Sequence, residues 1–319
     1  MDASPPFKRS AVDVKYIMAC DESGAKGYAD QVEQYPGQVG VFAGLLVPDA
    51  ALAPTERALE AAIAPHRTGD GKLHITDVTP TDRSALRTGI FDVVRTLELP
   101  CFWYAIHVEG FNAHHLRMAK LLEDSVSRAQ ALGSSVKSGA PREKPDLLHV
   151  ELFRALYAHM VAFIEERAPG EVEIEARTDR VDTPIAKSFR AEAERLLKPS
   201  RSSVVTGFDR ETRQVVKREL HFHTEFPPEL QVATRVKSLD LRIVGDDDPI
   251  VVAADVLANS LYHHFRGRSA DQLYKELNRP DAVKGHPLAL NLDTFWNWGG
   301  GDLVGDRMFR HPKADPVAD

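Results

Sequence analysis

Two adjacent carboxylates, Asp21 and Glu22, directly follow a short apolar run at residues 14–20. The run is rich in strand-forming residues, and a glycine two positions after Glu22 predicts a turn, so both carboxylates lie at the carboxyl end of a predicted strand. Carboxylates at the end of a buried strand are costly unless a positive charge neutralises them. Ligands of open α/β sheets bind at this end of the strands. A divalent cation is the simplest partner, so the pair predicts a metal site.

Two further aspartates are placed where they could join this site. Asp179 ends the stretch 171–179, in which apolar and polar residues alternate as in a strand with one wet face. Asp255 lies within an apolar stretch that is predicted to be a helix buried on more than one face, and Asn259, one turn later, could orient it. Taken singly, Asp179 could be a turn residue and Asp255 could pair with an arginine.

Together the three aspartates suggest a cluster. Parallel neighbouring strands would bring Asp21 and Asp179 side by side, and a helix packed across them could present Asp255. Three or four carboxylates in one cleft cannot all ionise without a cation, because like charges raise one another's pKa. Oxygen ligands alone select Mg²⁺ or Mn²⁺ over zinc. His74 could shuttle protons nearby, or it could be an ordinary core or surface residue.

The elements that must position these residues alternate between strands and helices. The patterns predict strands at 14–21, 39–47, 100–108, 171–179 and 238–244, and helices at about 53–64, 81–97, 112–132, 147–168, 183–197 and 249–265. Asp248 is the predicted N-cap of the last helix. This order predicts an α/β protein with a single domain over residues 1–285 and a tail, 286–319, with little regular structure.

Composition favours an ordinary globular protein. The chain has 319 residues, of which 43% are hydrophobic, enough for one large domain or two small ones. No stretch approaches the roughly 18 apolar residues of a membrane span, and residues 1–10 lack the apolar part of a secretory signal. The only cysteines, Cys20 and Cys101, suit a reducing cytoplasm and exclude a zinc ribbon or a disulfide framework.

The charge is unevenly distributed. The net charge of −7 argues mildly against a surface coated by nucleic acid, yet residues 177–218 hold eleven Lys and Arg against six Asp and Glu. This segment is either a solvated surface or a phosphate-binding one. The candidates for binding a nucleic-acid backbone are Arg180, Lys187, Arg210, Arg213, Lys217 and Arg218.

Other chemistries have weaker support. His221 and His223 would share one face of a strand and, with Glu225, could bind zinc or iron, although such a pattern also arises by chance among thirteen histidines. Ser23 lacks the glycines of a nucleophile elbow, and Cys20 lies in an apolar strand where a thiol is usually inert. No glycine pattern of a nucleotide-binding loop is present in the sequence.

Several local sequences resemble a bacterial family catalogued as domain of unknown function 3800, which has the ribonuclease H-like fold. The motifs are Asp21–Gly24, Phe42–Leu45, Leu73–Asp77, Asp179–Arg180 and Ala254–Ala258, and the similarity spans about residues 14–266. The resemblance implies a ribonuclease H-like mixed five-stranded sheet flanked by helices, with a helical insertion at about 109–168 before the fourth strand.

The resemblance also implies a function. It suggests an acidic site of Asp21, Asp179 and Asp255, with Glu22 or another glutamate as a fourth member, which holds Mg²⁺ or Mn²⁺ and hydrolyses phosphodiester bonds of RNA or DNA. One alternative is a non-catalytic scaffold of a bacterial defence or mobile-element system that binds nucleic acid or protein. A second is a metal hydrolase based on His221 and His223.

Overall fold

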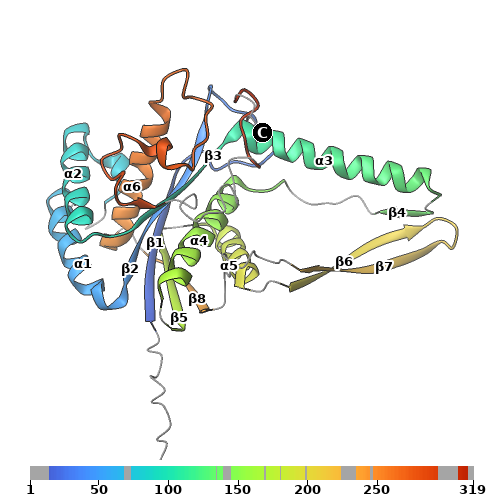
Figure 1. Cartoon of the computed structure of the whole chain (residues 1–319), viewed down its shortest axis with the longest axis horizontal. Coiled ribbons are helices and arrows are strands. Elements are labelled where there is room, and N and C mark those ends of the chain that lie inside the picture. Colours follow the sequence, from blue (N-terminus) through green and yellow to red (C-terminus); the bar gives the residue numbers. More distant parts are fainter. Residues whose placement is uncertain are drawn as a thin grey trace, which may run out of the picture.

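The computed structural model describes residues 14–67, 73–133, 135–138, 145–168, 170–179, 181–197, 200–223, 235–244, 247–293 and 308–314. Within these ranges, Figure 1 shows helices packed around a central sheet, and a long arm that projects from this body. In the part that is described, no helix combines the length and the apolar character needed to cross a bilayer.

The main sheet has six strands in the order β8-β5-β1-β2-β3-β9. They are β1 (Val14–Gly24), β2 (Val39–Pro48), β3 (Cys101–His107), β5 (Val172–Thr178), β8 (Val236–Ile243) and β9 (Leu292–Asp293). β1, β2 and β3 form an antiparallel meander, whereas β5 runs parallel to β1, β8 parallel to β5, and β9 parallel to β3. The expected five strands are present, and the two-residue β9 is a sixth that was not expected.

Helices cover both faces of this sheet. The helices are α1 (Asp49–Ile63), α2 (Pro80–Thr96), α3 (Val108–Ala131), α4 (Leu148–Arg167), α5 (Thr183–Leu197) and α6 (Pro249–Arg266), with 3-10 turns η1 (Ala64–His66), η2 (Ile75–Asp77) and η4 (Pro280–Val283). One apolar core joins α1, α2 and α6 to the sheet, and a second joins α4 and α5 to its other face. Because side chains alternate along β1, Ile17 and Ala19 enter the first core while Met18 and Cys20 enter the second.

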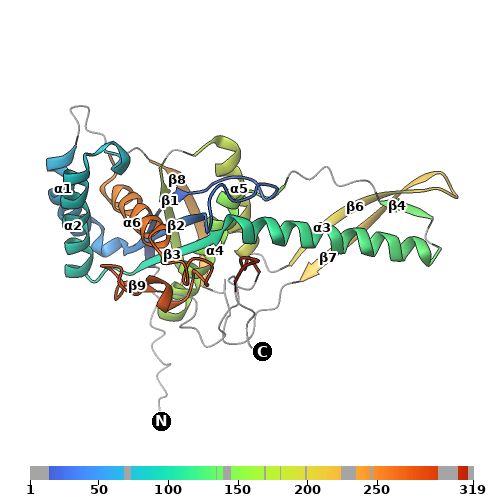
Figure 2. The same ribbon diagram turned by 90° about the horizontal axis from the view of Figure 1, so that it is seen from above.

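The predicted helical insertion at 109–168 is divided in the structure. Only α3 extends into the arm, whereas α4 packs on the sheet as part of the second core. The rest of the arm is a three-stranded sheet of order β4-β6-β7, made of β4 (Val136–Ser138), β6 (Ser200–Asp209) and β7 (Gln214–His223). In both views the arm points away from α1 and α2 (Figure 1 and Figure 2).

The alternation over 171–179 produces a face that is only partly wet, because Glu173 is exposed whereas Glu175 is not. Glu175 of β5 is only 2% exposed and lies 2.7 Å from the Lys15 Nζ and 2.9 Å from the Arg177 Nε. Arg177 also contacts Glu56 of α1 at 3.0 Å and Asp248, the N-cap of α6, at 2.9 Å. Glu175 and Arg177, on the polar face of β5, therefore belong to an ion-pair network that connects the sheet to α1 and α6.

Candidate functional site

Asp21 is placed by the alternation of β1. Its side chain follows Ala19 on the face covered by α6 and is 6% exposed, and its Oδ1 accepts a hydrogen bond of 2.8 Å from the backbone N–H of Glu22. Cys20, on the opposite face, is a buried free thiol whose pKa is raised by burial, as expected for an inert cysteine.

Asp255 reaches the same region from α6. Asp248 begins this helix by accepting hydrogen bonds from the backbone N–H groups of Ile250 and Val251, which confirms the predicted N-cap. Two turns later Asp255 is 7% exposed, and its Oδ2 accepts a hydrogen bond of 3.0 Å from the backbone N–H of Ile75. The helix is buried on several faces, as its apolar sequence predicted.

Asp21 and Asp255 interact electrostatically. Burial raises the pKa of Asp21 well above its ordinary value, and the charges of Glu22 and Asp255 raise it further. Burial also raises the pKa of Asp255, against the opposing effects of His74 and of the Ile75 amide. Two buried carboxyl groups that resist ionisation would be stabilised by a cation between them.

Glu22 has the opposite electrostatic environment. Burial alone would raise its pKa, but a contact of 3.2 Å with the His149 Nε2 and an ion pair with Lys26 lower the pKa to about 2. His149 comes from α4, on the face of the sheet opposite α6. The neighbours Asp21 and Glu22 therefore differ strongly in proton affinity, an arrangement found where one carboxyl holds a proton and the next stays ionised.

His74 borders the site as the N-cap of η2. Its Nδ1 lies 2.7 Å from the Thr76 Oγ1, and the imidazole is close enough to Asp255 to lower the pKa of that carboxyl. The side chain is partly exposed, so it can exchange protons with solvent. The structure thus brings together Asp21, Glu22, Asp255 and His74.

Asp179 lies at the adjacent strand end. The register pairs Cys20 of β1 with Thr178 of β5, so Asp21 and Asp179 are the next residues on two parallel neighbours. Asp179 is partly buried. Throughout the described ranges, however, no three His, Cys, Asp or Glu side chains form a group able to hold a metal ion. The carboxylate oxygens match the chemistry of Mg²⁺ or Mn²⁺, but their present positions provide no three-ligand group.

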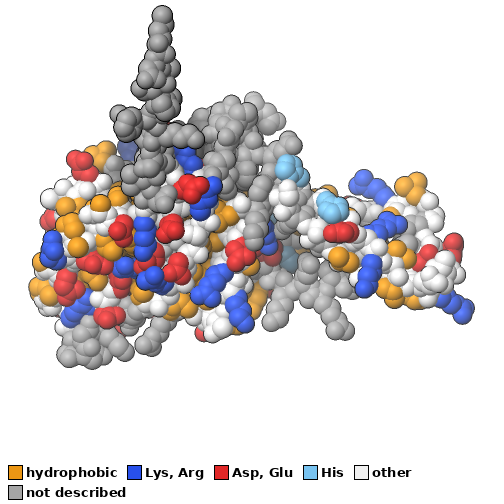
Figure 3. Space-filling view, turned by 90° about the horizontal axis from the view of Figure 1, so that it is seen from below, with side chains coloured by type: hydrophobic (Ala, Val, Ile, Leu, Met, Phe, Trp, Pro, Cys, Tyr) orange, Lys and Arg blue, Asp and Glu red, His pale blue; other side chains and the backbone are white. Residues whose placement is uncertain are grey.

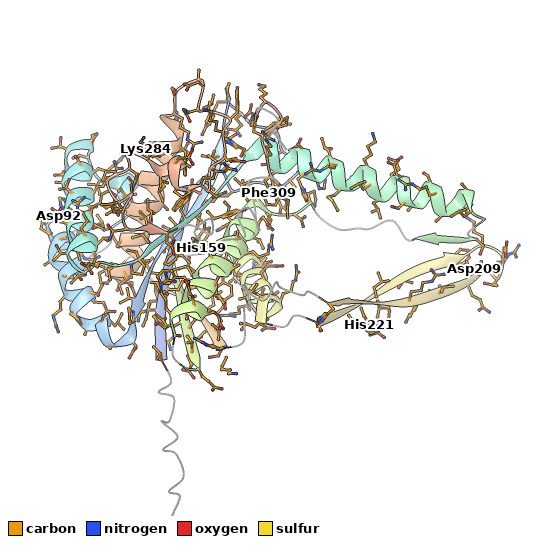
Figure 4. The ribbon with its side chains drawn as sticks, in the orientation of Figure 1. Asp92, His159, Asp209, His221, Lys284 and Phe309 are labelled. Carbon is orange, nitrogen blue, oxygen red and sulfur yellow. The ribbon has the colours of Figure 1, made fainter. Side chains whose placement is uncertain are left out.

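The candidate nucleic-acid residues are dispersed. Lys187 is exposed on α5, whereas Arg210 and Arg213 lie in the turn between β6 and β7, next to Asp209 at the far end of the arm (Figure 4). Lys217 and Arg218 are successive strand residues and therefore point to opposite faces of the hairpin. Arg180 lies outside the described residues. Figure 3 shows basic and acidic side chains interspersed, rather than a continuous basic surface.

The histidine pair of β7 is far from the carboxylates. His221 and His223 are exposed on one face of the hairpin, and the His223 Nδ1 lies 2.7 Å from the Ser200 Oγ. His221 is at the end of the hairpin nearest the body (Figure 4). Glu225, the third residue of the proposed His-based site, falls outside the described residues.

Sequence reasoning missed several polar residues around the carboxylates. They are Lys26 and His149, which contact Glu22, and, further out, Arg87 beside Asn259, Arg83 beside Thr76, Tyr262 beside Gly24 and Arg266 beside Tyr35. The i to i+4 spacing of Arg83 and Arg87 on a predicted helix was the one visible signal, because it places two cations on one face. Comparison with known proteins finds no matching family model and no significantly similar curated protein.

Proposed function

We propose that this protein is a metal-dependent hydrolase of phosphodiester bonds, with Asp21 and Asp255 at the centre of its site. The observation that carries the proposal is the electrostatic coupling of these two buried carboxyl groups, one at the end of β1 and one in the middle of α6. Such a pair is costly to the fold, since burial and like charge both oppose ionisation. Perturbed carboxyl groups of this kind cluster at functional sites.

The fold supports the proposal. The order β3-β2-β1-β5-β8, with an antiparallel meander followed by two strands parallel to β1, is the arrangement expected of a ribonuclease H-like fold. Asp21 and Asp179 directly follow Cys20 and Thr178, the last paired residues of two adjacent parallel strands, and ligands of α/β proteins bind near such strand ends. Membership of the family called domain of unknown function 3800 is part of the same proposal.

The chain's own residues would have distinct roles. Asp21 and Asp255 would hold Mg²⁺ or Mn²⁺ through carboxylate oxygens, and Asp179 would add a third ligand from β5. When bound, the metal supplies activation of water and stabilisation of the charge that develops on phosphate. Glu22, held ionised by His149 and Lys26, would keep the negative charge that attracts the cation. His74, at the edge of the site, would move a proton to or from solvent.

Metal titration tests the proposal directly. Isothermal titration should detect Mn²⁺ binding to the wild type, and both Asp21→Asn and Asp255→Asn should weaken it at least tenfold. Asp92→Asn is the matched control, because Asp92 is an exposed residue of α2 that pairs with Arg95. Unchanged Mn²⁺ affinity in both site variants would refute the metal site.

An activity assay then separates the hydrolase from the scaffold alternative. Labelled RNA and DNA strands should be cleaved by the wild type with Mn²⁺ or Mg²⁺, and cleavage should be lost with EDTA and in Asp21→Asn. Metal binding without cleavage of either nucleic acid, combined with nucleic-acid binding, would favour the non-catalytic scaffold. The same assay with His221→Asn and His223→Asn tests the His-based alternative, which requires these variants to be inactive.

A further inference from the structure

A row of polar residues leads from Asp255 toward the surface along α6. Asn259, Tyr262, His263 and Arg266 follow Asp255 at spacings of one helical turn, and their exposure increases from buried Asn259 to exposed Arg266. From α2, the Arg87 Nη2 donates a hydrogen bond of 3.2 Å to the Asn259 Oδ1. We call this surface the α2–α6 seam and define it by Arg83, Arg87, Asn259, His263 and Arg266.

Arg83 and Arg87, the two arginines that α2 contributes to the seam, contact neutral partners. Arg83 donates to the carbonyl oxygens of Thr76 and Val78 at 3.1 and 3.0 Å, and Arg87 donates to Asn259. Over the described ranges, neither arginine forms an ion pair with Asp or Glu, and the Nε atoms of both are buried without a hydrogen-bond partner. A buried guanidinium N–H without a hydrogen-bond partner is costly, even where the rest of the side chain is partly exposed.

These cations also disfavour one another. Burial and the charge of Arg83 lower the pKa of Arg87, so its cationic form is held at some energetic cost. Burial, followed by the charges of Arg87, Arg266 and Arg83, lowers the pKa of His263. Three arginines whose charges together disfavour protonation of His263 form a site that an anion would neutralise.

The outer end of the seam touches the turn that follows the carboxylates. Tyr262 packs so closely on Gly24 that a Cβ at that glycine would lie 2.7 Å from the Tyr262 Cδ2. The Tyr262 hydroxyl lies 2.9 Å from the hydroxyl of Tyr35, and the Arg266 guanidinium is 5.5 Å from the centre of the Tyr35 ring. Aromatic rings beside arginines are the combination with which proteins bind single-stranded nucleic acids.

We propose that the α2–α6 seam binds successive phosphate groups of a single-stranded nucleic acid, with Arg83 and Arg87 on the phosphates next to the carboxylates and Arg266 on a phosphate further out. The proposal rests on the proposed hydrolase function in one respect, because the seam would guide the nucleic acid toward Asp21 and Asp255. It places the main phosphate contacts on the body of the protein, whereas the sequence placed them on the hairpin of the arm.

Binding without metal tests the seam independently of catalysis. Fluorescence anisotropy with labelled single-stranded RNA and DNA of twelve nucleotides, in EDTA and over a series of salt concentrations, gives the affinity and its salt dependence. Arg87→Gln and Arg266→Gln should each weaken binding about tenfold and make the salt slope shallower by about 0.7 for each lost phosphate contact. Arg95→Gln, on the same helix but paired with Asp92, should bind like the wild type.

Two further variants complete the test. The variant with Gln at Arg210, Arg213, Lys217 and Arg218 should retain most of the affinity, and Asp21→Asn should bind at least as tightly as the wild type. Wild-type affinity in both seam variants, or loss of affinity only in the hairpin variant, would overturn the proposal. Binding of inorganic phosphate but of neither oligonucleotide would also overturn it. Seam-dependent binding with no cleavage under any metal condition would uphold the seam and refute the hydrolase.

The Arg266→Gln variant shows whether a loss of binding could come from a change in folding. Because this residue is exposed at the end of α6, its replacement leaves the core intact, and melting of Arg266→Gln should match the wild type. Arg87→Lys serves the same purpose at the half-buried position, since it keeps the charge and should recover part of the affinity lost in Arg87→Gln.

Discussion

The Asp255 Oδ2 accepts the backbone N–H of Ile75 at a distance of 3.0 Å. This hydrogen bond joins α6 to the segment that carries His74, so the carboxyl group has a structural role besides the metal-binding role proposed for it. A carboxamide can replace it as an acceptor, whereas a methyl group cannot.

We therefore expect Asp255→Asn and Asp255→Ala to differ in stability. The alanine leaves the buried Ile75 amide unsatisfied and should lower the free energy of unfolding by about 1–3 kcal/mol relative to the asparagine. Urea denaturation of both variants without divalent metal checks this. Equal stability of the two would show that the Ile75 bond contributes nothing.

Asp21→Asn should stabilise the metal-free protein at neutral pH. The folded-state pKa of Asp21 is raised above that of the unfolded chain, so its favourable contribution is complete only at low pH and is lost as pH rises through the folded pKa. Each pKa unit of difference corresponds to about 1.4 kcal/mol.

The expected signature is a pH-dependent difference in Tm. At pH 7 in EDTA the variant should melt about 2 °C or more above the wild type, and the difference should disappear below about pH 4. A variant that melts lower than the wild type at pH 7 would contradict the raised pKa.

Gly24→Ala should be costly for two separable reasons. Its φ of +86° disfavours any other residue, and a Cβ would lie 2.6 Å from the Val39 carbonyl oxygen. Gly133 has a φ of +82° but open space around it, so Gly133→Ala measures the backbone cost alone. We expect about 1 kcal/mol for Gly133→Ala and at least 1 kcal/mol more for Gly24→Ala, measured by thermal unfolding.

The sequence predicted the position of Asp255 because its helix is apolar on nearly every face, which leaves the carboxylate conspicuous. It also predicted the carboxyl end of β5 to within one residue, whereas β1 continues to Gly24, three residues past the expected end at Asp21, because residues 21–24 still pair with β2. It failed at β6 and most of β7, where charged, small polar and apolar residues are mixed, so periodicity carried no clear signal.

The contacts around Glu22 and Glu175 were beyond sequence reasoning for another reason. His149 meets Glu22 from α4, and Lys15 meets Glu175 across 160 positions of sequence. No local pattern specifies which cation will neutralise which carboxylate. The alternation of β5 was interpreted as a wet face because an ion-pair network and a solvated face have the same sequence pattern.

The Arg177 network should support the sheet. Arg177→Met removes the cation that Glu175, Glu56 and Asp248 share, and breaking such a partly buried network should cost about 3 kcal/mol at pH 7. Burial raises the pKa of Glu175, but Lys15 and Arg177 together lower it by more, so the folded-state pKa lies below that of the unfolded chain. The stabilisation is therefore present above the unfolded pKa and is lost as the pH falls through the folded pKa.

Denaturation at two pH values checks this prediction. The loss of stability in Arg177→Met should be large at pH 7 and should shrink as acidification protonates Glu175. Arg195→Met is the control, since the side chain of Arg195 is 49% exposed and pairs with Glu192 within the same helix, α5. A loss that is independent of pH would assign the effect to packing rather than to charge.

The parallel pairing of β1 with β5 also determines the order in which the strands of the sheet can pair during synthesis. The meander β1–β2–β3 is available once residue 107 has left the ribosome, but β5, β8 and α6 follow only after Val172. Until then one edge of the apolar strand β1 has no partner and can pair with another nascent chain. A chain truncated before Val172 would keep that edge open, so the strand that carries Asp21 is also where an incomplete chain is most prone to aggregate.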